Sequence, residues 1–216
     1  MSRIVFFPVG LALLLALSSG AWAASPDALT EWPESAMETY KAVLQNKKAF
    51  YSTDDKKYYL LDEFDYWNEL DNLPLKAVRF AVVDMDGDGM PEIVLELTSG
   101  FDGAFEVLHY EEGTVFGFNH SYRGLLGLTS NGIYEGSNGA GVSGFFRSSF
   151  KKDTYSEEAL GYTEYADDGR TTYHIGKEIV SEERYDEFLE GMWTHARENE
   201  AVWHEYTDAG VASVFK

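Results

Sequence analysis

The spacing of hydrophobic positions divides the chain into helix-like and strand-like parts. The first helical pattern lies in 35–45, where apolar side chains recur at three- and four-residue intervals on one face. That face contains Met37, Tyr40, Val43 and Leu44. Ser35 and Glu38 stand at the spacing of a capping box, which predicts that the helix begins there. An aromatic and apolar cluster over 58–70 favours a second helix that ends near Pro74.

From Leu75 onward the pattern becomes that of strands, with turn signals about every ten residues. This rhythm is typical of an antiparallel meander. A last helix is predicted after Ser181, whose side chain can cap it. Its apolar stripe should pack on the sheet, and contains Tyr185, Phe188, Leu189, Met192, Trp193 and Ala196. The fold class is therefore predicted as α+β, a twisted antiparallel sheet covered by N-terminal helices and one C-terminal helix.

The first residues have the pattern of an export signal. Arg3 precedes an apolar stretch, and Ala21 and Ala23 form a small-residue cleavage site. We therefore expect a signal peptide over 1–23, a mobile leader over 24–34 and one α+β domain over 35–216. A membrane anchor is the alternative, but the apolar stretch is short for a span of about 20 residues. The processed protein is expected to be secreted and to have no membrane span.

Acidic residues far outnumber basic ones. The chain has 37 Asp and Glu against 17 Lys and Arg, for a formal net charge of −20. Such a chain repels the phosphates of nucleic acids, so nucleic-acid binding is excluded as a function class. The same charge favours cationic partners and divalent metal ions. The chain has no cysteine, so no disulfide supports the fold.

The acidic residues are most regularly spaced in 84–92. Carboxylates stand at loop positions 1, 3, 5 and 9, which are Asp84, Asp86, Asp88 and Glu92. The glycines between them allow the backbone to curl, because glycine reaches positive φ without a steric cost. Calcium binds six to eight oxygen ligands in irregular geometry. Those four side chains, together with the carbonyl of Met90, are therefore predicted to bind Ca²⁺.

This loop resembles two families of calcium loops. Its first six positions match the D-x-D-x-D-G pattern of EF-hands, but Leu95 stands where an EF-hand has its bidentate Glu. The strand-like flanks and the acid at position 9 are more similar to the loops of integrin-type FG-GAP and VCBS repeats, although only one copy is present. More broadly, the chain resembles secreted proteins of Gram-positive gut bacteria that carry a single D-x-D-G-D-G-x-P-E loop. That resemblance implies secretion and a calcium loop, and no activity.

Two alternatives for the loop stay open at this point. The acids can also belong to a hairpin turn without a metal, although four such charges repel one another when no cation is present. Glu96 lies close behind the loop, and the sequence does not decide whether it is an additional ligand.

The chemistry of known catalytic motifs is weakly represented. Ser148 and Lys151 match S-x-x-K, but the accompanying motifs of that enzyme class are missing, so chance explains the match better. No two of the five histidines have the spacing of a zinc motif. We therefore expect a secreted, non-enzymatic calcium-binding protein whose calcium loop could present a surface to an extracellular protein or glycan partner. The alternative is a secreted hydrolase or glycan-binding module in which calcium is structural, suggested by an aromatic content of 15%.

Overall fold

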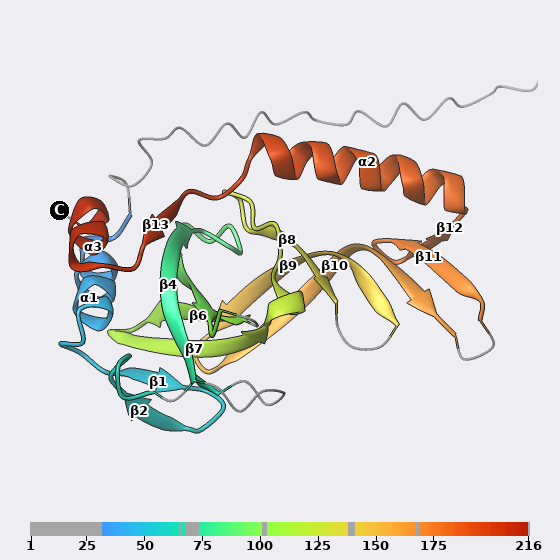
Figure 1. The fold of residues 1–216 in the computed structure, drawn as a ribbon. Helices are drawn as coiled ribbons and strands as arrows, with labels where there is room; N and C mark the ends of the chain where they lie inside the picture. Colours follow the sequence, from blue (N-terminus) through green and yellow to red (C-terminus); the bar gives the residue numbers. More distant parts are fainter. Residues whose placement is uncertain are drawn as a thin grey trace, which may run out of the picture.

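The computed structural model describes residues 32–64, 66–67, 74–100, 103–137, 141–166 and 169–215. Within them the chain forms two β-sheets and three α-helices, which confirms the α+β class (Figure 1). The predicted signal peptide over 1–23 and most of the predicted leader lie outside the described residues. None of the described helices is both long and apolar enough to cross a membrane.

The larger sheet has eight strands, seven of which follow one another in space. In spatial order these are β13 (Trp203–Glu205), β4 (Pro74–Val83), β5 (Glu92–Thr98), β6 (Gly103–Glu111), β7 (Thr114–Ser121), β1 (Phe50–Ser52) and β2 (Lys57–Tyr59). The short strand β3 (Tyr66–Trp67) pairs with the start of β4. From β4 to β7 the strands follow one another as an antiparallel meander, as the sequence predicts. The pairing of β1 with β7 is parallel.

The smaller sheet has five strands and was not predicted as a separate layer. Its spatial order is β12 (Glu178–Val180), β11 (Thr171–Ile175), β10 (Thr154–Tyr165), β9 (Val142–Lys151) and β8 (Ile133–Ser137). A 3₁₀ turn, η2 (Tyr122–Gly124), follows β7. The segment from Leu125 to Leu128 makes a single β-bridge, between Leu126 and Glu135. The single sheet of the prediction is thus replaced by two.

Each face of the larger sheet has its own apolar core. On one face α1 (Glu34–Leu44) and α3 (Asp208–Val214) pack against the sheet, with Tyr40 of α1 and Leu95 of β5 fully buried (Figure 1). On the other face side chains such as Val107 of β6 pack against Phe146 of β9. The smaller sheet therefore covers the face that the helices leave open.

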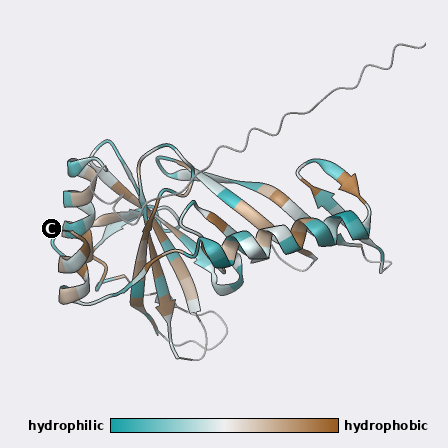
Figure 2. Ribbon diagram, turned by 90° about the horizontal axis from the view of Figure 1, so that it is seen from above, coloured by the Kyte–Doolittle hydropathy of each residue, from teal (hydrophilic) through white to brown (hydrophobic). Residues whose placement is uncertain are grey.

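The helix α2 (Glu182–Glu198) runs along the smaller sheet, which extends away from α1 and α3 (Figures 1 and 2). Ser181 caps it as predicted, accepting a hydrogen bond from the backbone N–H of Arg184. Its predicted apolar stripe is only partly covered, because Tyr185 is buried whereas Trp193 is 46% exposed.

Two of the predicted helical features are wrong. The segment over 58–70 forms a helix nowhere in its described residues, since it contains part of β2, a turn and β3. Near its start, the ring of Tyr59 packs edge-on against the ring of Phe64. The first helix begins at Glu34 after Pro33, and no side chain caps it, so Ser35 is not the N-cap. The short α3 was not predicted at all.

Candidate metal centre

Residues 84–91 form the loop that joins β4 to β5. The two strands are antiparallel, and Val83 and Glu92 lie directly opposite each other where the loop begins and ends. Gly87 and Gly89 have φ values of 79° and 87°, which are left-handed conformations that favour glycine. The expected curl of the backbone is therefore present, and it turns the aspartate side chains of the loop toward one another.

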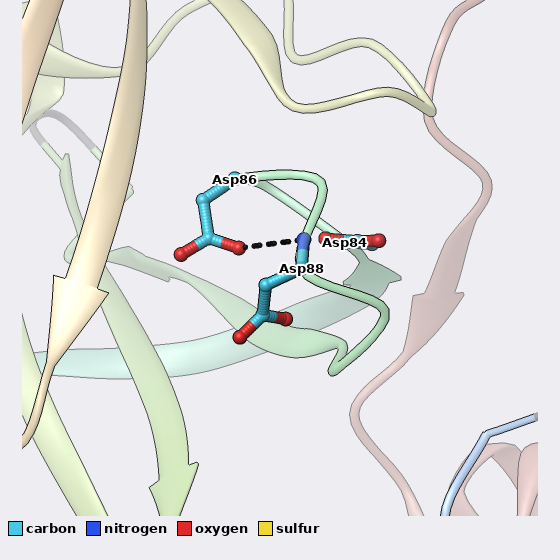
Figure 3. A group of neighbouring side chains, drawn as sticks. All are labelled: Asp84, Asp86 and Asp88. Atoms are coloured by element: carbon cyan, nitrogen blue, oxygen red, sulfur yellow. Dashed lines mark hydrogen bonds between the residues drawn. The ribbon is translucent and has the colours of Figure 1, made fainter.

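Three of the predicted ligands come together in this loop. Asp84, Asp86 and Asp88 can each place one carboxylate oxygen within 4.8 Å of the others (Figure 3). All three donor atoms are carboxylate oxygens, which suit hard divalent cations such as Ca²⁺ and Mg²⁺. The described residues therefore contain one compact set of oxygen donors of the kind that the sequence predicts.

Backbone amides of the loop hold these carboxylates in place. Asp84 accepts hydrogen bonds from the N–H groups of Gly87 and Gly89, at 2.7 and 3.0 Å. Asp86 accepts one from the N–H of Asp88 at 3.2 Å (Figure 3). Asp88 accepts one from the N–H of Met90 at 2.6 Å. The bonds fix the side chains before any ion binds, so little conformational freedom remains to be lost on binding.

The cluster is unfavourable while all three groups are charged and no cation is present. Partial burial raises the pKa of Asp86, and the nearby charges of Asp88 and Asp84 raise it further. The backbone N–H groups of Phe150 and Asp88 act in the opposite direction. A divalent cation among the carboxylates would remove the repulsion and favour the charged form of Asp86.

The loop also contacts three other parts of the fold. Oδ2 of Asp86 accepts a hydrogen bond of 3.1 Å from the N–H of Phe150 in β9. On the side of α1, the hydroxyl of Tyr40 donates to the carbonyl of Pro91 at 2.7 Å. Gly132, at φ 77°, lies so close to Met85 that an added Cβ would overlap the Met85 backbone. The loop is therefore fixed where α1 and both sheets meet.

Glu92, the fourth predicted side-chain ligand, does not join the aspartate cluster. It is fully buried, and Oε2 accepts a hydrogen bond of 2.9 Å from the N–H of Met85. Oε1 lies 3.0 Å from Nδ1 of His109, which stacks on the ring of Phe150. A carboxylate has about four lone-pair sites, so these two bonds still leave acceptor capacity for an ion.

Glu92 and His109 form a buried ionisable pair. Burial raises the pKa of Glu92 to about 7, although the hydrogen bonds from His109 and Met85 oppose the rise. Burial also disfavours the charged form of His109, but the contact with Glu92 outweighs it and raises the pKa of the imidazole. Sequence reasoning missed this role, because β6 is buried on both faces and shows no alternation that would mark His109 as an inward polar residue.

The remaining predicted donors lie as follows. Met90 is half-buried at the end of the loop, and its N–H is the donor to Asp88. Glu96, left open as an additional ligand, forms an ion pair with Arg79 on the neighbouring strand. That pairing points the Glu96 carboxylate toward a cation that the chain itself supplies.

No family model, no curated protein and no solved structure matches the chain.

The weak S-x-x-K match has no catalytic geometry. Ser148 is fully buried, and its Oγ lies 2.8 Å from the hydroxyl of Tyr134. Lys151 stands three residues later in the same strand and is exposed, so the two side chains lie on opposite faces. A lysine there cannot activate the serine hydroxyl.

Proposed function

We propose that this protein is a secreted, non-enzymatic calcium-binding protein whose single ion stabilises the loop between β4 and β5. The observation that carries the proposal is the convergence of Asp84, Asp86 and Asp88 to within 4.8 Å of one another. Three like charges so close together are stable only if they are screened, protonated or neutralised by a cation.

In the proposed site these three aspartates are the principal ligands. The carbonyl of Met90 and the carboxylate of Glu92 are the further ligands that the loop spacing predicts. Glu92 lies outside the aspartate cluster, where it is bonded to Met85 and His109, so it would have to turn toward the ion. Calcium is favoured over magnesium because its oxygen cage tolerates irregular geometry, whereas magnesium requires an octahedron close to ideal. A hairpin loop whose carboxylates are already bonded to its own amides offers donors in an irregular arrangement.

The ion would act beyond the hairpin itself. Asp86 is bonded to β9, and Pro91 is bonded to α1, so the loop connects layers that are distant in sequence. A cation held there would strengthen the packing of both sheets in a chain without disulfides. It would also fix the surrounding surface, to which an extracellular protein or glycan partner could bind.

Secretion is the part of the proposal that depends on the N-terminal pattern alone. Sites with dissociation constants of about 10⁻⁴ to 10⁻³ M are common in extracellular modules, where calcium is abundant. An exported protein can therefore use a loop with few charged ligands as a permanent structural element.

Thermal unfolding in EDTA, in millimolar Ca²⁺ and in millimolar Mg²⁺ tests the proposal. Calcium at 100 times its dissociation constant should add about 2.7 kcal/mol to the free energy of unfolding. Magnesium should add clearly less. Equal melting temperatures in EDTA and in calcium would contradict the proposal.

A further inference from the structure

A second site of interest lies away from the calcium loop, at the edge of the core between the two sheets. There a cavity of about 120 Å³ opens between β13, β4, β5 and the segment 125–128. Its side-chain walls include Arg79, Glu96, Phe105, Tyr122, Glu200 and Trp203. The cavity is smaller than the roughly 300 Å³ at which sites for drug-sized ligands begin. It therefore suits one small ring or one side-chain-sized group.

One wall of this cavity is polar. Arg79 and Glu96 lie directly opposite each other on β4 and β5 and form an ion pair. The guanidinium of Arg79 lies 4.7 Å from the ring centroid of Trp203. A fixed N–H donor thus stands beside a fixed carboxylate acceptor, and the Arg79 side chain is 45% exposed. Two neighbouring hydroxyl groups, each able to donate and to accept, are complementary to such a pair.

The other wall is aromatic. The buried ring of Phe105 stacks on Tyr122, with centroids 6.3 Å apart and planes 10° apart, and lies 6.3 Å from Trp203. Tyr122 is 48% exposed, so it offers aromatic surface to a molecule that enters the cavity. Aromatic side chains in such places pack against flat apolar faces while the polar edge of the ligand stays hydrogen-bonded.

The charges of the cavity narrow the class of ligand. An anion would approach Glu96 and Glu200 in a chain of net charge −20, which is unfavourable. A cation would meet the guanidinium of Arg79, which already lies over Trp203 and already pairs with Glu96, so that Glu200 is the one charge left to attract it among the described residues that line the cavity. A purely apolar group would desolvate the ion pair without replacing its hydrogen bonds with water. A neutral ligand with one apolar face and a hydroxylated edge avoids all three costs.

We propose that this cavity binds one ring of a neutral carbohydrate, with the exposed ring of Tyr122, backed by the buried Phe105, against the apolar face of the sugar and Arg79, Glu96 and Glu200 bonded to its hydroxyl groups. The site is independent of the proposed calcium loop. The aromatic content of the sequence suggested a glycan-binding module as an alternative function, and this cavity would be its binding site.

Ligand-observed saturation-transfer NMR of the full chain in millimolar Ca²⁺ tests this proposal, with glucose, galactose, mannose and N-acetylglucosamine as probes. We expect at least one sugar to bind. Its dissociation constant should rise about fivefold to tenfold in Tyr122→Ala, the loss of one aromatic contact. Tyr165→Ala is the matched control, because this tyrosine is 58% exposed on β10 and lies outside the cavity. The sugar should bind to Tyr165→Ala with the same dissociation constant as to the wild type.

The indole N–H resonances locate the sugar without any change to the site. Titration should shift the resonance of Trp203 and leave that of Trp193 on α2 unchanged. The proposal is overturned if none of the four sugars binds, or if Tyr122→Ala binds as tightly as the wild type. A shift of the Trp203 resonance by trilysine and by none of the sugars would also overturn it, and would identify a cation-binding cavity.

Discussion

Oδ2 of Asp86 accepts a hydrogen bond of 3.1 Å from the backbone N–H of Phe150. Phe150 belongs to β9 of the smaller sheet, whereas Asp86 lies in the loop between β4 and β5 of the larger sheet and is one of the three carboxylates of the aspartate cluster. The same side chain therefore links the candidate metal centre to the smaller sheet. Any ion held by this carboxylate acts on the packing of the two sheets as well as on the hairpin.

Replacing Asp86 by Asn separates these two roles. The amide keeps an oxygen that can accept from Phe150, but the negative charge is lost. We expect the calcium dissociation constant to rise at least about tenfold, which corresponds to roughly 1.4 kcal/mol. In EDTA the variant should melt at or above the wild-type temperature, because repulsion from Asp84 and Asp88 is reduced. Calorimetric titration and thermal unfolding measure the two effects.

Asp153→Asn is the matched control for that experiment. Asp153 is exposed in the turn between β9 and β10, so its replacement removes the same charge away from the loop. It should bind calcium as the wild type does. If Asp86→Asn and Asp153→Asn bind equally tightly, Asp86 is not a ligand.

Gly132→Ala should destabilise the loop between β4 and β5, although Gly132 itself lies outside that loop. A Cβ at this position would overlap the Met85 backbone, and φ is 77°, where alanine is strained. We expect a loss of about 2 kcal/mol in the free energy of unfolding, measured by urea denaturation in EDTA. Gly191→Ala gives the opposite sign, because that glycine lies in α2 with open space around it, and alanine there should stabilise by about 0.5–1 kcal/mol. Equal effects of the two substitutions would contradict the packing described here.

The pair of Glu92 and His109 predicts a pattern of single and double variants. His109→Phe leaves the buried Glu92 carboxylate without its imidazole partner, which should cost about 3 kcal/mol in urea denaturation at pH 8 in EDTA. Adding Glu92→Gln removes that isolated charge while an acceptor for the Met85 N–H remains. The double variant should therefore be more stable than His109→Phe alone. A double variant that loses the sum of the two single effects would show that the residues are not coupled.

Glu106 predicts how stability changes with pH away from the loop. It is fully buried in β6, and this burial raises its pKa to about 8, with Asn119 opposing the rise and the charge of Asp54 adding to it. Because the pKa is higher in the folded state than in the unfolded chain, this group lowers stability as pH rises from about 4.5 toward 8. Glu106→Gln removes the effect. The variant should gain roughly 3 kcal/mol on the wild type between pH 5 and pH 8 in urea denaturation. Parallel pH profiles of the two proteins would show that Glu106 is charged in the folded state.

Local sequence patterns predicted the features that depend on near neighbours. The loop with its converging aspartates, the meander from β4 to β7 and the Ser181 cap of α2 all follow from spacing over a few residues. Each is fixed by backbone conformation or by hydrogen bonds within a short segment, so the signal is present in the segment itself.

Features set by distant contacts were not predicted. The start of the segment 58–70, where the local pattern favoured a helix, is a strand because Tyr58 pairs with Tyr51 in β1. The strand β1 is held in turn by β7, in which Phe116 pairs with Tyr51. The division into two sheets depends on which strands pair with which, and the spacing of hydrophobic residues within one segment does not reveal that pairing. Glu92 was expected to face an ion, but it also meets His109 from β6, a partner 17 residues away. The aromatic residues and the ion pair of the cavity beside Trp203 likewise come from separate segments.

The most direct test of the account is isothermal titration of Ca²⁺ into the wild-type chain and into a variant with Asp84, Asp86 and Asp88 all replaced by Asn. The account predicts about one ion per wild-type chain, with a dissociation constant of about 10⁻⁴ to 10⁻³ M or tighter. It predicts no measurable binding to the triple variant in a chain that still unfolds cooperatively in EDTA. Absence of binding to the wild type, or equal binding to both proteins, would contradict it.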